Sequence, residues 1–290
     1  MTKEITAETA LTMYYDEHCL NRVVQAQSSY KHVIEHLKKH FGPLSTNIIS
    51  PNDVYDYCKK RKNAEIGKCA GDGTLDRELR ILITAIKYAA KRLKIPTDEA
   101  VPDIRFSFPS PPQAKETWLT IQEMNKMLEL AKNGKDNYTR TYRFCMLGFY
   151  TGQRKKAILE LKTSQVDLQS GIIDFNPPGR AQTKKNRPKV PIADELLPII
   201  KQAIEQKQEY ICIHPGDIRK SFETVVKKCK FDKHVTPHVL RHTYASQALQ
   251  AGVTIWEVAG VMGDDPKMVL ERYGHHDPNF LRSAVNFRRK

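Results

Sequence analysis

Four prolines fall within one short segment of the chain, VPDIRFSFPSPPQ at 101–113. Each proline removes a backbone donor and biases the residue before it towards extended geometry, so no long helix or central strand is expected to run through this segment. A chain of 290 residues is also long enough for two domains of ordinary size. The sequence therefore predicts one domain over 1–104, a proline-rich linker over 105–114 and a second domain over 115–290.

The first domain is expected to be helical. Apolar residues recur there at steps of three and four, the spacing of one helix face: Leu75, Leu79, Leu82, Ile86, Ala90 and Leu93. Thr74 is expected to cap this helix. Val33, Ile34 and Leu37 predict an earlier helix that ends at Gly42. Another is expected over 53–62, after Ser50-Pro51-Asn52.

The second domain is expected to be mainly helical with a small antiparallel sheet. Thr120 and Glu123 have the spacing of a capping box in front of an apolar stripe. Further helices are expected over 140–150, 193–206, 218–229 and 238–251. Between 165 and 192, short β-branched and aromatic runs alternate with glycine and proline clusters, which predicts short antiparallel strands.

The charge of the chain predicts a polyanionic partner. The net charge is +14, with 17 basic and 14 acidic residues in 1–110 and 30 basic and 19 acidic residues in the remainder. Proteins that neutralise phosphates release counterions and so gain affinity for nucleic acid. The basic excess lies mainly in the second domain.

Other classes of protein are disfavoured by what the sequence lacks. It has no run of roughly 18 apolar residues that would span a membrane, and its first residues have no apolar signal core. We therefore expect a cytoplasmic protein without a membrane partner. The six cysteines include no C-x-x-C pair and are expected to be reduced thiols. Cys212 and His214 alone are too few for a zinc site.

Two motifs place an arginine where local structure would fix it. Arg154 follows Gly152, which is expected to end one helix just before the next begins. Taken alone, Arg154 is better explained as a solvent-facing arginine beside Lys155 and Lys156. His238 and Arg241 have i, i+3 spacing on a helix expected to start at Thr236-Pro237, so they share one face. Taken alone, such a pair is more often a surface feature.

Two further motifs carry a lysine and a tyrosine. The segment QTKKNRP at 182–188 is the tip between two predicted strands, where Lys184 or Lys185 would lie in a DNA groove or in solvent. Tyr273 lies in LERYGHH at 270–276, and its plainest interpretation is a core tyrosine on a helix.

In chain order these positions resemble the signature of the tyrosine recombinases, also called the phage integrase family: Arg154, Lys184, His238, Arg241 and Tyr273. TGQR resembles the first box of the family, TPHVLRHTYAS the second and VMGDDPKMVLERYGHH the third. The 32 residues from Arg241 to Tyr273 are close to the family spacing. Residues 1–104 resemble its helical core-binding DNA-binding domain, and residues 115–290 its catalytic domain.

The resemblance implies a site-specific recombinase that integrates or excises a mobile element or prophage through a 3′-phosphotyrosyl intermediate. Two guanidiniums suit the phosphate because their forked donors match its oxygens and stay charged. Tyr273 would be the nucleophile and His238 the acceptor of its proton. The strand-tip lysine would protonate the leaving 5′-oxygen. Lys184 is the best match, and Lys185 stays open. No cofactor or metal is implied.

Two positions depart from the family pattern. Ala157 stands where an acid is usual, and Asp264 stands where histidine or tryptophan is usual. A carboxylate repels a phosphate unless it pairs with an arginine or turns away. Asp264 is therefore not assigned to phosphate binding, and Asp264 or His275 is expected to support the site. If Asp264→His leaves strand cleavage unchanged, the position does not limit the reaction.

The resemblance also implies partners. Double-stranded DNA would be wrapped by both domains, with four protomers assembled on two sites and a DNA-bending or directionality factor left open. The tail at 277–290 would dock on a neighbouring protomer or on its own domain. Two alternatives remain: a catalytically impaired DNA-binding relative, and strand relaxation of the type IB topoisomerase kind.

Overall fold

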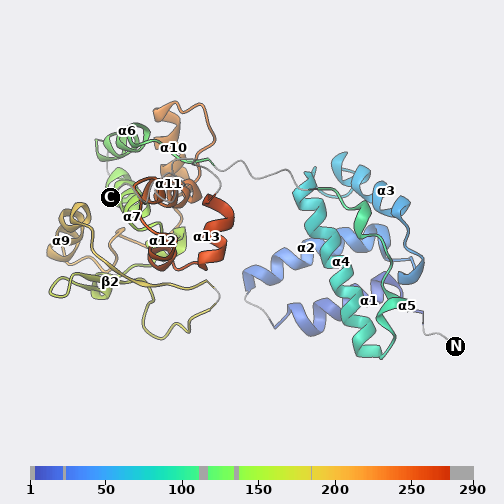
Figure 1. The fold of residues 1–290 in the computed structure, drawn as a ribbon. Coiled ribbons are helices and arrows are strands. Elements are labelled where there is room, and N and C mark those ends of the chain that lie inside the picture. The colour runs from blue at the N-terminus through green and yellow to red at the C-terminus, as the bar shows by residue number, and fades with distance from the viewer. Residues whose placement is uncertain (1–3, 22–23, 111–116, 134–136, 184, 275–290) are drawn as a thin grey trace, which may run out of the picture. The chain divides into compact units, whose positions relative to one another are not determined.

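The structure is a computed structural model of the chain, and it describes residues 4–21, 24–110, 117–133, 137–183 and 185–274. The chain divides into two compact units, Met1–Ala114 and Lys115–Lys290 (Figure 1). Both units are mainly helical, and the described sheet is small and antiparallel, so the predicted fold class is confirmed. In the described part of the chain, no helix is both long enough and apolar enough to cross a membrane.

Unit 1 (residues 1–114) is a bundle of helices around the long helix α4. Its helices are α1 (Ala7–Tyr14), α2 (Val24–Phe41), α3 (Pro51–Lys62), α4 (Asp72–Leu93) and α5 (Thr97–Ala100). A π-helical turn covers Tyr15–Cys19, and 3-10 turns cover Thr46–Ile48 and Arg105–Ser107. The predicted apolar face of α4 is confirmed, because Leu75, Leu79, Leu82, Ile86 and Ala90 are all buried.

The starts of α3 and α4 both differ from the predicted ones. Helix α3 starts at Pro51, two residues before the predicted 53, after a capping box in which Asp53 N lies 3.4 Å from Ser50 Oγ and Ser50 N lies 2.8 Å from Asp53 Oδ2. The Thr74 cap is wrong. Helix α4 starts at Asp72 after Gly71, and Thr74 N donates to Gly71 O (2.9 Å) within the first turn. Apolar periodicity marks where the buried face begins, not where the backbone becomes helical.

The first residues of the proline-rich segment pack on unit 1. Ile104 is buried, and Phe108 packs against the same core. Between them lies the 3-10 turn Arg105–Ser107. The segment 104–108 is therefore anchored to unit 1 through Ile104 and Phe108, although its composition is that of a linker.

Unit 2 (residues 115–290) combines helices with three short strands. Its helices are α6 (Ile121–Lys132), α7 (Asn137–Thr151), α8 (Lys155–Leu159), α9 (Leu197–Glu205), α10 (Arg219–Cys229), α11 (Pro237–Gln250), α12 (Ile255–Met262) and α13 (Pro266–Tyr273). The strands β1 (Val166–Asp167), β2 (Ile172–Asp174) and β3 (Lys189–Pro191) form an antiparallel sheet in that order. 3-10 turns cover Thr163–Gln165 and Asp194–Leu196.

These elements confirm the helices and strands predicted for the second half of the chain, with the first turn of the 193–206 segment in 3-10 form. The predicted capping box of α6 is also present, because Thr120 and Glu123 bond each other's backbone N–H groups. In the sheet, Val166 lies opposite Ile173, and Ile173 lies opposite Val190.

Helices α7 and α11 pack directly against each other in unit 2 (Figure 1). Gly148 permits this close approach, because a Cβ at Gly148 would lie 2.7 Å from Leu240 Cδ1. Phe144 and Leu147 on α7 are buried in the same core as Val239 and Leu240 on α11. The end of α7 is therefore held at a fixed position relative to α11.

Candidate active site

Arg154 stands at a sharp corner between α7 and α8. Gly152 follows α7 with a φ of +59°, a conformation that favours glycine, and a Cβ there would lie 2.5 Å from Tyr244 Cδ1. Arg154 is the N-cap residue of α8. The predicted helix break at Gly152 is confirmed, and the side chain of Arg154 leaves the corner from a fixed backbone position.

Arg241 lies on α11 with its side chain only 2% exposed. Its Nη1 donates to Gly152 O (2.6 Å) and to Met262 O (3.0 Å). The guanidinium therefore ties the α7–α8 corner to the end of α12. Burial lowers the pKa of Arg241, and the neighbouring Asp264 carboxylate opposes this shift. Buried charges need such partners, and here backbone carbonyls and a carboxylate provide them.

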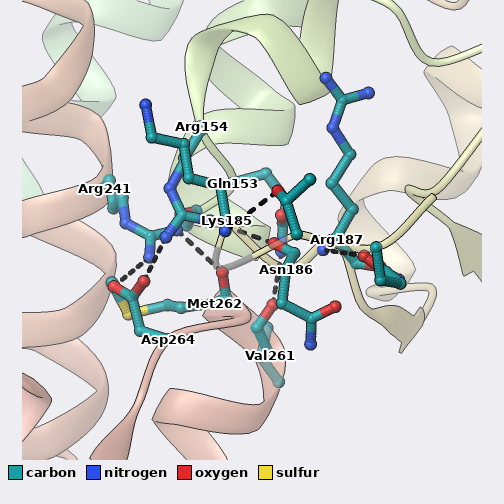
Figure 2. A network of polar contacts seen from close by, with 12 residues as sticks. Gln153, Arg154, Lys185, Asn186, Arg187, Arg241, Val261, Met262 and Asp264 are labelled. Carbon is teal, nitrogen blue, oxygen red and sulfur yellow. Dashed lines mark hydrogen bonds and ion pairs between the residues drawn. The ribbon is translucent and has the colours of Figure 1, made fainter. Parts of the chain in front are cut away.

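Asp264 joins the two arginines. Its Oδ1 accepts a hydrogen bond from Arg154 Nη2, and its Oδ2 accepts one from Arg241 Nη2 (Figure 2). Gly263 ends α12 with a φ of +66°, and Asp264 N then donates to Ala259 O (3.0 Å). The structure thus brings Arg154 and Arg241 together on one carboxylate. Asp264 therefore does not turn away from the site but pairs with both arginines.

Tyr273 is the last residue of α13, and its ring is buried. Its hydroxyl lies 2.8 Å from Nδ1 of His242, which follows Arg241 on α11. His238 lies one turn earlier on α11, and its ring stacks edge-on against His242 with centroids 4.7 Å apart. The phenol hydrogen bond that the structure describes therefore goes to His242, a residue to which the sequence analysis gave no role. The i, i+4 spacing of His238 and His242 on one helix face was the signal for it.

Both histidines lie in a cationic environment, in which His242 is partly buried and His238 is exposed. Desolvation lowers the pKa of His238, and Arg241, Arg272 and Arg154 lower it further. Burial, followed by His238, Arg272 and Arg241, lowers the pKa of His242 to about 4. Both rings are therefore neutral at pH 7, and a neutral imidazole has one nitrogen that accepts a hydrogen bond from the phenol.

The tip between β2 and β3 is attached to Arg154. Asn186 O accepts a hydrogen bond from Arg154 Nη1 (3.1 Å), and the preceding Lys185 is exposed (Figure 2). Lys185 O in turn accepts from Arg180 Nη2 (3.2 Å). Lys184 lies outside the described residues, as do His275 and the 277–290 tail, so their predicted roles stay predictions.

A pocket of about 390 Å³ opens at His238. Its polar lining also includes Lys155, Arg219, His234 and the carboxylate of Glu223. Among the described residues, no group of three or more His, Cys, Asp or Glu side chains could hold a metal ion.

Comparison with known proteins finds similar sequences and similar folds. The model of the phage integrase family matches residues 117–279, more than half of the chain. A protein named tyrosine recombinase from Thermosipho africanus is 24% identical over 273 residues, which make up 90% of this chain and 92% of that protein.

Solved structures are similar in fold. The Tn1549 transposon integrase, solved in complex with transposon right end DNA, is similar with a TM-score of 0.77 and 16% sequence identity. The aligned region makes up 99% of this chain and 100% of the integrase chain. A lambda integrase, solved as a tetramer bound to a Holliday junction, is similar with a TM-score of 0.70 and 14% sequence identity. The aligned region makes up 95% of this chain and 80% of the lambda integrase chain.

Proposed function

The chain belongs to the phage integrase family of tyrosine-type site-specific recombinases, and we propose that it cuts one DNA strand with Tyr273 while Arg154 and Arg241 hold the scissile phosphate. The observation that carries this proposal is the convergence of both guanidiniums on one small anion, the Asp264 carboxylate. Donors that meet on a carboxylate also suit a phosphate, because both anions match the arginine fork.

The reaction has two transfers at one phosphorus. The Tyr273 oxygen attacks the phosphorus, forms a 3′-phosphotyrosyl bond and releases the 5′-oxygen, which takes up a proton from the strand-tip lysine, Lys184 or Lys185. The energy of the broken bond stays in the phosphotyrosyl bond, so the 5′-hydroxyl of another strand can reverse the step and rejoin DNA.

The nucleophile is supported by the histidines of α11. The phenol pKa is ordinarily about 10, so at pH 7 the hydroxyl is protonated and must lose its proton as the bond forms. The hydrogen bond to His242 fixes the direction of the hydroxyl, and the charge of Arg241 favours the phenolate. His238, whose ring packs against that of His242, would receive the proton, as the family resemblance implies.

The same proposal extends to partners. Unit 1 would bind duplex DNA as the core-binding domain, and four protomers would assemble on two sites in the cytoplasm, with the 277–290 tail contacting a neighbour or its own domain. The lambda integrase tetramer and the DNA-bound Tn1549 integrase support this part, since each shares the fold of this chain. An accessory bending or directionality factor belongs to the same proposal.

A covalent trapping assay tests the activity. Duplexes that the full chain selects from a random pool are converted into nicked suicide substrates, from which the cleaved fragment diffuses away. We expect a denaturing gel to show DNA-linked protein for wild type and none for Tyr273→Phe. Binding without a linked band would indicate the impaired DNA-binding relative. Relaxation of supercoils without recombination of two sites would indicate the topoisomerase alternative.

A further inference from the structure

The described site already contains an anion of its own. Asp264 presents one oxygen to each guanidinium, and both bonds use the Nη2 atom of the arginine. A phosphodiester also has two non-bridging oxygens on one central atom, so it would seek these same donors. A phosphate and a carboxylate on the same two donors would repel each other.

Each arginine has backbone partners in addition to Asp264. Arg241 Nη1 is held by Gly152 O (2.6 Å) and Met262 O (3.0 Å), and Arg154 Nη1 is held by Asn186 O (3.1 Å). These carbonyls would keep the guanidiniums in place if the carboxylate left. A purely supporting role for Asp264 would duplicate contacts that the backbone already makes.

The carboxylate is also able to leave. Its backbone is anchored by the end of α12, where Asp264 N donates to Ala259 O (3.0 Å). Its side chain is 17% exposed, against 2% for Arg241. Rotation of this one side chain towards solvent would therefore release both Nη2 donors without moving α12 or either arginine.

We propose that Asp264 is an internal competitor for the scissile phosphate, which occupies the arginine pair until DNA displaces it. This inference rests on the proposed function, because it assigns Arg154 and Arg241 to phosphate. A competitor lowers the apparent affinity by the fraction of molecules in which the site is open. Only DNA that binds strongly through the rest of the protein would then open the site.

The test compares Asp264→Asn with wild type in two measurements on the full chain. The first is the thermal midpoint of unfolding without ligand, and the second is the dissociation constant for a selected duplex. Asp265→Asn is the matched control, because it removes the same charge one residue away, and asparagine is as good an N-cap for α13 as aspartate. A parallel titration uses inorganic phosphate at constant ionic strength, read as the rise in midpoint.

If Asp264 competes with phosphate, its replacement should change the stability of the free protein and the affinity for DNA in opposite directions. Asp264→Asn should lower the midpoint without ligand, because two guanidiniums lose their anion. It should also bind the duplex at least fivefold more tightly and gain more stabilisation from phosphate than wild type. Adding Arg154→Ala to Asp264→Asn should remove the phosphate gain. Asp265→Asn should change neither measurement in this way.

Other results would overturn the inference. A lower midpoint together with weaker duplex and phosphate binding would make Asp264 a permanent support. Binding unchanged relative to Asp265→Asn would show that the carboxylate does not compete. If wild type bound no duplex at all, the proposed function would fail, and the phosphate titration would still decide the role of Asp264.

Discussion

At the scale of single residues, the two arginines are held with different firmness. The side chain of Arg241 is 2% exposed and bonded to two carbonyls, while that of Arg154 is 29% exposed and bonded to one. Arg241 is therefore part of the fold as well as of the site. Arg154 is the arginine whose loss can be studied with little disturbance of folding.

Arg154→Lys keeps the charge but loses the planar guanidinium, which bonds Asn186 O through Nη1 while Nη2 faces the anion. We expect single-turnover cleavage of the suicide duplex to fall on the order of a hundredfold, as for the loss of one preorganised donor, with the unfolding midpoint nearly unchanged. Cleavage within threefold of wild type would mean that Arg154 supplies only charge. A circular dichroism melt of each variant checks the folding.

His242 offers a second prediction at this scale. Asparagine places a polar side-chain atom near the position of histidine Nδ1, so His242→Asn keeps an acceptor for the Tyr273 hydroxyl, whereas His242→Phe removes it. If His242 orients the phenol, cleavage should be largely retained in the asparagine variant and fall about tenfold or more in the phenylalanine variant.

The pH profile of the same variants separates orientation from proton transfer. An orienting role predicts parallel profiles for wild type and His242→Asn. Loss of cleavage in both variants, with an altered profile, would instead make His242 the proton acceptor. Equal activity of all three proteins would contradict any role for the contact.

The residues of the site were only partly predictable from sequence. Arg154, Arg241 and Tyr273 follow from the family pattern, and the structure brings the two arginines together. The bridge through Asp264 and the contact of His242 with Tyr273 depend on how α11, α12 and α13 pack. The packing of helices against one another cannot be read from a single sequence, so neither contact could be predicted.

At the scale of elements, the α7–α8 corner controls the site. Gly152 combines a positive φ with a tight contact to Tyr244, whereas Gly171 has a similar φ of +69° and no atom within 4 Å of an added Cβ. Gly152 O also accepts from Arg241. Substitutions at these two glycines can therefore be compared to separate the cost of a strained backbone from the cost of a steric contact.

Gly171→Ala should cost about 1 to 2 kcal/mol of unfolding free energy, the penalty for a left-handed alanine. Gly152→Ala should cost clearly more, because Tyr244 must also move, and it should reduce cleavage by displacing the carbonyl that holds Arg241. Chemical denaturation with both variants measures the difference. Equal destabilisation would show that the corner has room for a Cβ.

Elements were predicted well where a backbone rule acts locally. A capping box located the start of α6, and the apolar face located the buried side of α4. The start of α4 was misplaced, because Gly71 has no side chain to signal a cap. The 3-10 turn at Arg105–Ser107 was also not foreseen, because burial of Ile104 and Phe108 is a tertiary effect.

At the scale of the whole molecule, the net charge of +14 predicts how DNA affinity depends on salt. Each neutralised phosphate contributes about −0.9 to the slope of log affinity against log salt. If the chain contacts six or more phosphates, affinity should fall on the order of a thousandfold between about 50 and 200 mM salt. Fluorescence anisotropy with a selected duplex measures the slope, and a flat response would contradict a basic DNA-binding surface.

A boundary between two domains was predicted because four prolines lie close together in 101–113. The structure divides the chain between Ala114 and Lys115. The mode of assembly was not visible. A single sequence does not give the surfaces that meet between protomers, and residues 275–290, for which docking is proposed, lie outside the described part of the chain.

In the proposed reaction a phenol oxygen attacks a phosphorus held by two guanidiniums, and the peptide that becomes linked to DNA identifies the attacking residue. After reaction with the suicide duplex, the protein is digested with nuclease and protease, and the peptide that carries a nucleotide is sequenced by tandem mass spectrometry. We expect one modified residue, Tyr273, and formation of this peptide slowed about a hundredfold or more in Arg154→Ala. A nucleotide on any other side chain, or none on a protein that still joins DNA, would contradict the proposed reaction.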